Sequence, residues 1–414
     1  MITTAIIAEY NPFHNGHLYQ LKKAKELTNC DHIVSIMSGN FVQRGEASLI
    51  NKFDRAFLSV MMGIDLCLEL PFCYATGSAH DFAYGAVSIL NSLNCIDYIC
   101  FGAETDDIDL LKEIAQIILD EPILYKNILK DNLAKGVSFP KARHIAIANV
   151  LGDNAKIDDI LKQPNNILAI EYLCALSFFK SKIKPIIIKR FGANYHDTSI
   201  NGEFASASAI RDEIINCGIS SKVTIAIPDT IHDYFINSFK INYPCVTDDL
   251  LTYIRSLYFK STLRDYCDFN IDLENKFKNA NSFCTYDEFI NQLSSKDITQ
   301  SRIKRAILHA IIGYTNENRN SFIENNYSFY ASILSFKKNS SELIKHIKVS
   351  SDIPIITKKA DFTKELNQYT QLNSSIAQRM WQLDSNATLL FNQLIYNRYN
   401  KILPNDYQKN IPII

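Results

Sequence analysis

The stretch EYNPFHNGHLYQL, residues 9–21, decides the interpretation of this chain. It overlaps a short, bounded apolar run, residues 3–10, which predicts a buried β-strand. Apolar residues then recur at three-residue steps from Leu18 to Leu27, so residues 16–29 predict an α-helix. The stretch therefore marks the turn from the first strand into the first helix, and this turn contains two histidines and a glycine.

The segments that follow continue the alternation of strand and helix. Apolar runs predict further strands at 32–39, 65–71, 97–104 and 184–192, and helical spacing predicts helices at 51–63 and 78–93. After residue 105 the pattern is mostly helical, over 107–133, 139–151 and 167–181. Strands that alternate with helices and are continuously apolar predict an α/β fold with a parallel sheet covered on both faces.

The pattern changes again after the strand predicted at 184–192. A polar loop leads into a helix that begins near Ser206 or Ser208, and either serine can cap it. Beyond residue 216 no further alternation is found, and residues 230–400 are largely helical by spacing. We therefore expect two domains, an α/β domain over residues 1–216 and a helical domain over residues 217–414.

Composition excludes several classes of protein. The 414 residues carry a formal net charge of -1, so no overall positive field points to nucleic acid, although the second half is slightly basic. The 10 cysteines contain no C-x-x-C pair, which argues against a zinc ribbon and fits a reducing cytosol. The N-terminus lacks the features of a signal peptide, and no stretch reaches the roughly 20 apolar residues of a membrane span. We expect a cytoplasmic protein without a membrane segment.

The residue types in the first turn suit a phosphate ligand. In open α/β sheets, ligands bind beyond the carboxyl ends of the strands, where a helix N-terminus offers free N–H groups and a positive dipole end. Gly16 allows close approach of a ligand, and the imidazoles of His14 and His17 add donors that can stabilise charge at phosphorus. A single histidine in such a turn is more often a cap or a packed ring, but two that frame a glycine favour a nucleotide site.

A second motif, SASAIRDEI at residues 206–214, supports the first. Ser206 and Ser208 can donate hydroxyl groups, and Arg211 lies in the first turn of the predicted helix. An arginine at that place can make charge-assisted contacts with the β and γ phosphates of a nucleoside triphosphate. Alone the motif indicates only a capped helix start, but the two motifs on one sheet indicate a nucleotidyltransferase-like site.

These two motifs resemble the H-x-G-H and late Ser/Thr-Ile-Arg signatures of the nucleotidyltransferase superfamily that includes the HIGH motif. Seven segments narrow the resemblance to the bacterial tRNA(Met) cytidine acetate ligase family: AEYNPFHNGHLYQL, SGNFVQRGEASLINKFDRA, LELPF, FGAE, QPNNILAIEY, IKRFGANYHD and SASAIR. The segments occur in order within the first 216 residues, and the resemblance extends more diffusely into the helical remainder. The resemblance implies a Rossmann-like domain that activates acetate with ATP as acetyl-adenylate, then transfers acetyl to N4 of the wobble cytidine of elongator tRNA(Met).

The resemblance also implies site residues. Catalysis would rest on His14, His17 and Arg211. ATP contacts would come from Ile7, Ala8, Glu9, Tyr10, Asn11, Pro12, Phe13, His14, Asn15, Gly16, His17, Leu18, Tyr19, Gln20, Gly102, Asn165, Arg190, Ser206 and Ser208. From the residues alone, Gly102 also fits a plain strand-end turn, Asn165 or Asn166 a helix cap, and Arg190 a surface arginine.

Two further segments are candidates for the transfer step. Gln43 and Arg44, in the polar stretch 38–48, are expected to lie in a loop that closes over the ligand and excludes water. His196 and Asp197 form a carboxylate–imidazole pair that can accept a proton, although such pairs more often belong to a buried polar network.

Basic residues in the second half are candidates for tRNA phosphate contacts. They are Arg302, Lys304, Arg305, Lys337 and Lys338, with Lys358 and Lys359 as a further pair. Most such clusters are ordinary solvated helix faces. No metal-ligand motif such as H-E-x-x-H is found, so Mg²⁺ is expected only through the phosphates of ATP.

Two other functions remain open at this level. An adenylyltransferase acting on a small phosphomonoester shares the fold and both motifs, but nearly 200 further helical residues suit a macromolecular substrate better. A non-catalytic RNA or ribosome partner that senses a nucleotide would keep the same site as a switch. Acetate-dependent pyrophosphate release separates the ligase from the first alternative, and N4-acetylcytidine in treated tRNA separates it from the second.

Overall fold

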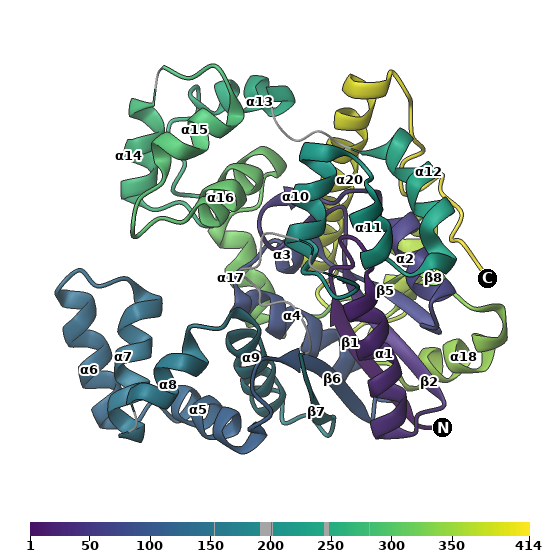
Figure 1. Ribbon diagram of the computed structural model, residues 1–414, viewed down its shortest axis with the longest axis horizontal. Helices are drawn as coiled ribbons and strands as arrows, with labels where there is room; N and C mark the ends of the chain where they lie inside the picture. The colour runs from purple at the N-terminus through teal and green to yellow at the C-terminus, as the bar shows by residue number, and fades with distance from the viewer. Residues whose placement is uncertain (153, 191–199, 201, 244–247, 281) are drawn as a thin grey trace.

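A single mixed sheet forms the centre of the molecule (Figure 1). The structure is a computed structural model that describes residues 1–152, 154–190, 200, 202–243, 248–280 and 282–414. In these residues seven strands pair in the order β7-β6-β1-β2-β5-β8-β9. Their bounds are Thr3–Ala8 for β1, His32–Ser38 for β2, Leu66–Leu70 for β5, Tyr98–Ala103 for β6, Lys184–Lys189 for β7, Ala331–Phe336 for β8 and Ile355–Ile356 for β9.

Five strands of this sheet, β1, β2, β5, β6 and β7, confirm the predicted α/β fold. Neighbours among β7, β6, β1, β2 and β5 run parallel. Helices connect and cover them: α1 Asn15–Thr28, α2 Lys52–Met61, α3 Phe72–Ala75, α4 Ala79–Ser92, α5 Ile108–Asp120, α6 Ile123–Ala134, α7 Phe139–Leu151, α8 Asn154–Leu161, α9 Pro164–Phe178 and α10 Ala207–Cys217. The helix predicted over 107–133 is two helices, because Pro122 caps the second one and lacks the N–H that would continue the first.

The region beyond residue 216 is largely helical, as predicted, but it also contributes two strands that the sequence pattern did not indicate. β8 pairs antiparallel with β5, and β9 pairs parallel with β8, so the second half completes the sheet of the first. β9 has only two residues, and both strands lie between helices, which hid them in a pattern dominated by helical spacing. The remaining helices are α11 Ser221–Ala226, α12 His232–Asn242, α13 Leu251–Leu257, α14 Ile271–Asn279, α15 Tyr286–Leu293, α16 Gln300–Ile312, α17 Asn316–Glu324, α18 Ser341–Ser350, α19 Phe362–Leu366 and α20 Ser374–Tyr399.

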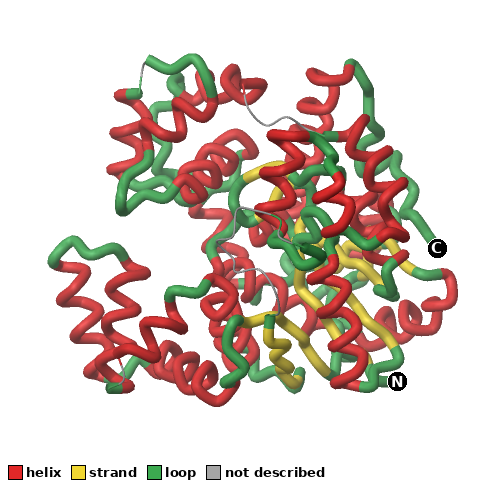
Figure 2. The backbone as a smooth tube through the Cα atoms, in the orientation of Figure 1, coloured by secondary structure: helices red, strands yellow, loops and turns green. Residues whose placement is uncertain are grey.

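Helices dominate the view outside the sheet (Figure 2). Two helical groups, α5–α8 and α13–α16, lie on the left in Figure 1, one below the other. The core is shared across the predicted boundary, because Val223 and Phe235 of the second half pack in one cluster with Ile6 and Leu21 of the first. The division at residue 216 stays a prediction.

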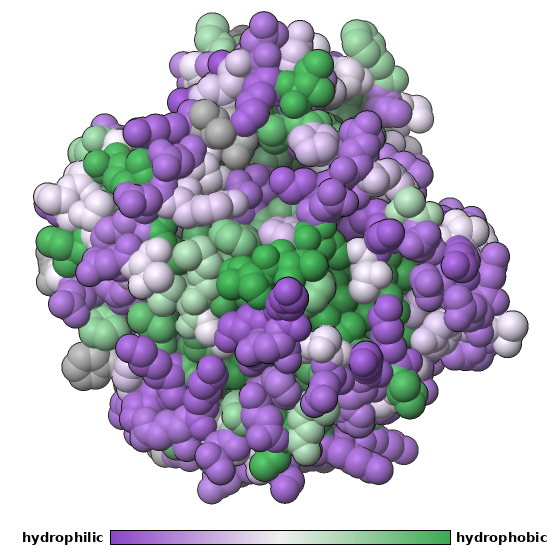
Figure 3. Space-filling model, turned by 90° about the vertical axis from the view of Figure 1, so that its right-hand side faces the viewer, coloured by the Kyte–Doolittle hydropathy of each residue, from purple (hydrophilic) through white to green (hydrophobic). Residues whose placement is uncertain are grey.

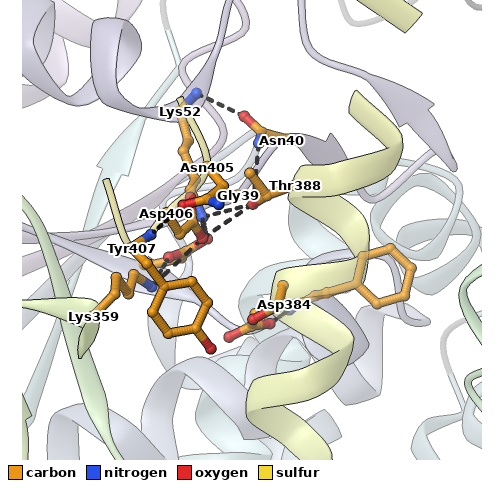
Figure 4. A network of polar contacts seen from close by, with 12 residues as sticks. Gly39, Asn40, Lys52, Lys359, Asp384, Thr388, Asn405, Asp406 and Tyr407 are labelled. Carbon is orange, nitrogen blue, oxygen red and sulfur yellow. Dashed lines mark hydrogen bonds and ion pairs between the residues drawn. The ribbon is translucent and has the colours of Figure 1, made fainter. Parts of the chain in front are cut away.

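A buried polar network fastens the C-terminal segment to the carboxyl ends of β2 and β5 (Figure 4). The Lys52 ammonium lies 2.7 Å from Glu69 and 2.6 Å from Asp406, and Lys359 lies 2.8 Å from Glu69. Burial alone lowers the pKa of Lys52, but the carboxylates of Asp406 and Glu69 raise it overall. These ion pairs therefore join α2, β5 and the residues that follow α20 into one unit. Asp384 of α20 lies beside them and accepts hydrogen bonds from Phe72 N and the Tyr330 hydroxyl.

The face on the right of Figure 1 carries an apolar area surrounded by hydrophilic residues (Figure 3). Within the described residues, no helix combines the length and the hydropathy that crossing a membrane would need.

Candidate functional site

The turn between β1 and α1 holds two imidazoles against a helix N-terminus. His14 is the N-cap of α1, and its Nδ1 accepts a hydrogen bond from Gly16 N at 3.0 Å. His17 Nδ1 accepts one from His14 N at 3.2 Å, which completes a capping box. Because each Nδ1 accepts, each neutral ring carries its proton on Nε2. The fold thus fixes two Nε2–H donors at the start of one helix.

The same packing keeps both rings neutral. Their centroids lie 3.8 Å apart in a stacked arrangement, and His14 is 6% exposed. Burial, together with His17, Arg190 and Arg211, holds the pKa of His14 well below its usual 6.5. Burial and the Arg190 charge lower the pKa of His17 to about 3. This arrangement suits an anionic ligand. The two arginines compensate its negative charge, and the neutral imidazoles donate hydrogen bonds to it without first taking up a proton.

The second sequence motif folds back onto the first. Ser206 caps α10 by accepting a hydrogen bond from Ala209 N at 3.0 Å, which decides between the two candidate caps. Arg211 donates from Nη1 to Asn11 O at 2.9 Å and from Nη2 to Ser208 Oγ at 3.2 Å. The arginine therefore bridges the two motifs, as expected for residues that act on one ligand.

Two adjoining pockets lie beyond the carboxyl ends of β1, β6 and β7. The smaller, of about 500 Å³, is lined by His14, Gly16, His17, Tyr19, Gln20, Gly102, Ile188, Lys189, Arg190, Phe204 and Ala205. The larger, of about 950 Å³, is lined by Ile7, Ala8, Glu9, Tyr10, Asn11, His17, Gln20, Gln43, Arg44, Phe82, Phe101, Gly102, Asn165, Leu168, Tyr172, Arg190 and Ala207. Four residues line both, so the pockets form one cleft at the edge of the sheet that the topology favours for ligands.

Not every predicted ATP contact reaches the cleft. Pro12, Phe13, Asn15, Leu18, Ser206 and Ser208 line neither pocket. Phe13 is 2% exposed in the core, and the Asn15 amide donates to the backbone oxygens of Glu203 and Ile225. Successive residues of a turn and of a helix point in different directions, so a continuous sequence motif cannot place all its side chains on one ligand.

Asn165 and Asn166 are not the caps of α9, because the helix begins earlier, at Pro164. Asn165 lines the larger pocket and donates to Glu104 Oε1 at 2.6 Å. Asn166 is buried and accepts from Glu104 N at 2.9 Å. The pair ties the end of β6, including Gly102, to the first turn of α9.

The stretch 38–48 is a short hairpin and not an irregular loop. Its strands are β3 Phe41–Val42 and β4 Glu46–Ala47, and Gln43 and Arg44 at its turn line the larger pocket. Gly45 has φ +72°, and a Cβ there would lie 2.5 Å from Arg305 N. The hairpin is therefore held tightly against α16.

His196 and Asp197, the predicted acid–base pair, lie outside the described residues. Their role stays a prediction.

The basic residues predicted to contact tRNA are engaged within the chain. Arg305 forms two hydrogen bonds with the Asp268 carboxylate, Arg302 donates to Asp268 O, and Lys304 lies 2.6 Å from Glu46 of the hairpin. Their contact with RNA stays a prediction.

Lys337 and Lys338 follow β8, and Lys337 N bonds to Asp65 O just before β5. They thus lie at the opposite edge of the sheet from His14. Lys359 is not a surface charge, because it is 8% exposed in the network of Figure 4.

Several residues of the cleft were missed from the sequence. Leu168 and Tyr172 follow Asn165 on one face of α9, and Phe101 precedes Gly102, so helical spacing and adjacency could have indicated them. Phe82 belongs to α4, and only the tertiary fold brings it to the pocket.

One buried amide group beside the cleft, Asn11 Nδ2, is left without a hydrogen-bond partner among the described residues. The same part of the chain contains no group of three or more His, Cys, Asp or Glu side chains arranged to hold a metal ion.

Comparison with known proteins agrees with this geometry. The HIGH Nucleotidyl Transferase family model matches residues 1–406, so the chain is a member of that family. A tRNA(Met) cytidine acetate ligase of Thermoanaerobacter sp. (strain X514) is 41% identical over 87% of this chain and 90% of its own length. One of Clostridium novyi is 40% identical over 90% and 93%. The chain belongs to the tRNA(Met) cytidine acetate ligase family.

Solved structures cover the full length. Thermotoga maritima TmcAL in its apo form matches with a TM-score of 0.94 and 30% identity over 100% of both chains. The same protein bound with alpha-thio ATP matches with a TM-score of 0.91 and 28% identity, again over 100% of both.

Proposed function

We propose that this chain activates acetate with ATP and transfers the acetyl group to N4 of the wobble cytidine of elongator tRNA(Met). The names of its relatives and the alpha-thio ATP bound to Thermotoga maritima TmcAL support the substrates. The observation that carries the proposal is the pair of stacked, neutral imidazoles at the N-terminus of α1, with Arg211 joined to the same turn. We expect the reaction in the cytoplasm.

The first step needs no protein nucleophile. The acetate carboxylate attacks the α-phosphorus of ATP, the bond to the β-phosphate oxygen breaks, and pyrophosphate leaves. His14 and His17 present Nε2–H donors to the oxygens on which charge develops, and Arg211 holds the β and γ phosphates. The smaller pocket accommodates the nucleoside, and Gly102 allows its close approach to β6. Mg²⁺ is expected to arrive with ATP, bound through phosphate oxygens and water.

Acetate-dependent exchange of pyrophosphate into ATP tests this step. His14→Asn keeps an N-cap side chain and His17→Gln keeps the capping box, while both remove the imidazole donor. Each change should lower exchange by about 10²–10³-fold with little loss of stability. Exchange within fivefold of wild type in both variants would contradict the mechanism.

The complete reaction is tested by incubation with ATP, labelled acetate and tRNA(Met), followed by nuclease digestion. Label in N4-acetylcytidine at position 34 is expected. Pyrophosphate release that depends on a phosphomonoester and not on acetate would instead indicate an adenylyltransferase. Unlabelled tRNA together with nucleotide binding would indicate a non-catalytic role.

A further inference from the structure

The larger pocket is built differently from the smaller one. The His14 imidazole and the backbone of β7 face the smaller pocket. The larger extends the other way, past the end of β1, between the β3–β4 hairpin, α4 and α9. His17 and Gly102 line both, so a group in the larger pocket lies next to the ligand of the smaller. A substrate that receives the acetyl group fits this position.

The floor of the larger pocket is aromatic. The rings of Phe101 and Tyr172 have centroids 5.3 Å apart at an interplanar angle of 43°. Together with Phe82 they are only 2–3% exposed, so the core holds these rings rigidly and leaves a small part of each for a ligand. An aromatic lining of this kind suits a flat, unstacked nucleobase, which proteins commonly bind against aromatic rings. It suits a small acid such as acetate less well.

A single carboxylate faces this pocket among its described lining residues, that of Glu9. Its Oε1 accepts a hydrogen bond from Gln43 N at 2.9 Å, and its backbone oxygen accepts one from Arg55 Nη1. Oε2 has no hydrogen bond to another described residue. Burial first, and then the charge of Glu9, raise the pKa of the Tyr172 hydroxyl, so Glu9 lies close to the aromatic floor. The side chain is thus fixed at one oxygen and open at the other.

We propose that the larger pocket binds the flipped-out cytosine of the acceptor RNA and that Glu9 Oε2 accepts the proton of its N4 amine. This inference rests on the proposed function. A carboxylate accepting from cytosine N4 is an established pairing, and uracil, which has an oxygen at that place, would be repelled. Glu9 would therefore serve both as general base and as the residue that selects cytosine.

The transfer step balances with groups already named. The N4 nitrogen attacks the carbonyl carbon of acetyl-adenylate, and a C–N bond forms. The bond from that carbon to the phosphate oxygen breaks, and AMP leaves with the electron pair. The proton lost by N4 passes to Glu9 Oε2 and then to solvent. No oxidant or further reactant is required.

Glu9→Gln separates the two half-reactions, since the glutamine oxygen can still accept from Gln43 N. The ratio of single-turnover acetyl transfer to tRNA(Met) over acetate-dependent ATP–pyrophosphate exchange should fall by about 10²-fold or more, as expected for loss of a general base that acts only in the second half-reaction. A merely structural role would lower both half-reactions together and would leave this ratio unchanged.

Glu213→Gln is the matched control, because Glu213 is a half-buried carboxylate that accepts one hydrogen bond, from Ser220, outside both pockets. It should leave exchange and transfer unchanged. Equal losses of exchange and transfer in Glu9→Gln, or transfer within threefold of wild type, would overturn the inference while the proposed function stands. A wild-type protein without exchange or transfer would overturn both.

Discussion

His14 in the cleft and Lys52 in the network of Figure 4 are both almost fully buried, at 6% and 1% exposed. They follow neighbouring strands at the same edge of the sheet. Lys52 meets the carboxylates of Glu69 and Asp406 at 2.7 and 2.6 Å. His14 and its neighbour His17 meet no carboxylate at that range among the described residues, and their pKa values are lowered by burial instead.

The difference separates a scaffold from a binding site. In the network, the ammonium groups of Lys52 and Lys359 are compensated by carboxylates of the chain, and these ion pairs hold α2, β5 and the C-terminal segment together. In the cleft, each imidazole uses its Nδ1 within the turn, so its Nε2–H group can donate to a ligand. Buried charge that is paired within the chain therefore indicates a scaffold here, and buried donors without a carboxylate partner indicate a binding site.

The largest effect is expected from breaking the network. Lys52→Met leaves Glu69 and Asp406 with less compensating charge in a buried place, so the free energy of unfolding should fall by about 3–5 kcal/mol. Chemical denaturation measures this loss.

Lys23→Met is the matched control, because Lys23 lies 2.7 Å from Glu26, the same separation, but at the exposed surface. Its loss should be far smaller, because water screens an exposed ion pair. Similar losses in the two variants would show that burial does not determine how much these ion pairs contribute to the free energy of unfolding.

A smaller effect, confined to activity, is expected from the cleft. Arg211→Ala should lower acetate-dependent pyrophosphate exchange by about 10²-fold, because the triphosphate loses a charge-assisted contact. Stability should change by about 1 kcal/mol or less, since Arg211 is partly exposed and makes two hydrogen bonds. Arg379 lies at the exposed surface, and Arg379→Ala should change neither pyrophosphate exchange nor stability. A stability loss in Arg211→Ala as large as that of Lys52→Met would contradict the distinction between the two regions.

The smallest effect is a pH dependence of opposite sign in the two regions. Burial, and then the charge of Glu69, raise the pKa of Asp384 to about 6. The folded protein therefore holds this proton more tightly than the unfolded chain does. As pH rises from 4 to 6, this group lowers the free energy of unfolding. The pKa of His14 is lowered, so the unfolded chain holds more protons and this group costs stability as pH falls below 6.5. Relative to wild type, Asp384→Asn should gain stability as pH rises and His14→Asn should gain stability as pH falls.

Urea denaturation of the three proteins from pH 4.5 to 7.5 checks this prediction. Curves that shift in the same direction for both variants would contradict it.

Local pattern predicted the cleft better than it predicted the sheet. The caps, the strand ends and the Ser206–Arg211 motif are local in sequence, so spacing and residue type indicated them. β8 was missed, because its place beside β5 depends on pairing across more than 250 residues. Lys304 and Arg305 resembled an RNA-binding surface, because a sequence does not reveal that Glu46 and Asp268 lie opposite them.

The sequence by itself determined the first turn: a strand that ends near Pro12, a helix that begins beyond His14, and two imidazoles three residues apart. Backbone geometry and helix capping depend on residues that are neighbours in the sequence, so the sequence alone indicates them. Only the tertiary structure decided that burial keeps both rings neutral, that Arg211 reaches the same turn, and that Glu9, Phe101 and Tyr172 share a pocket. Those facts depend on burial and on contacts between distant segments, which packing alone sets.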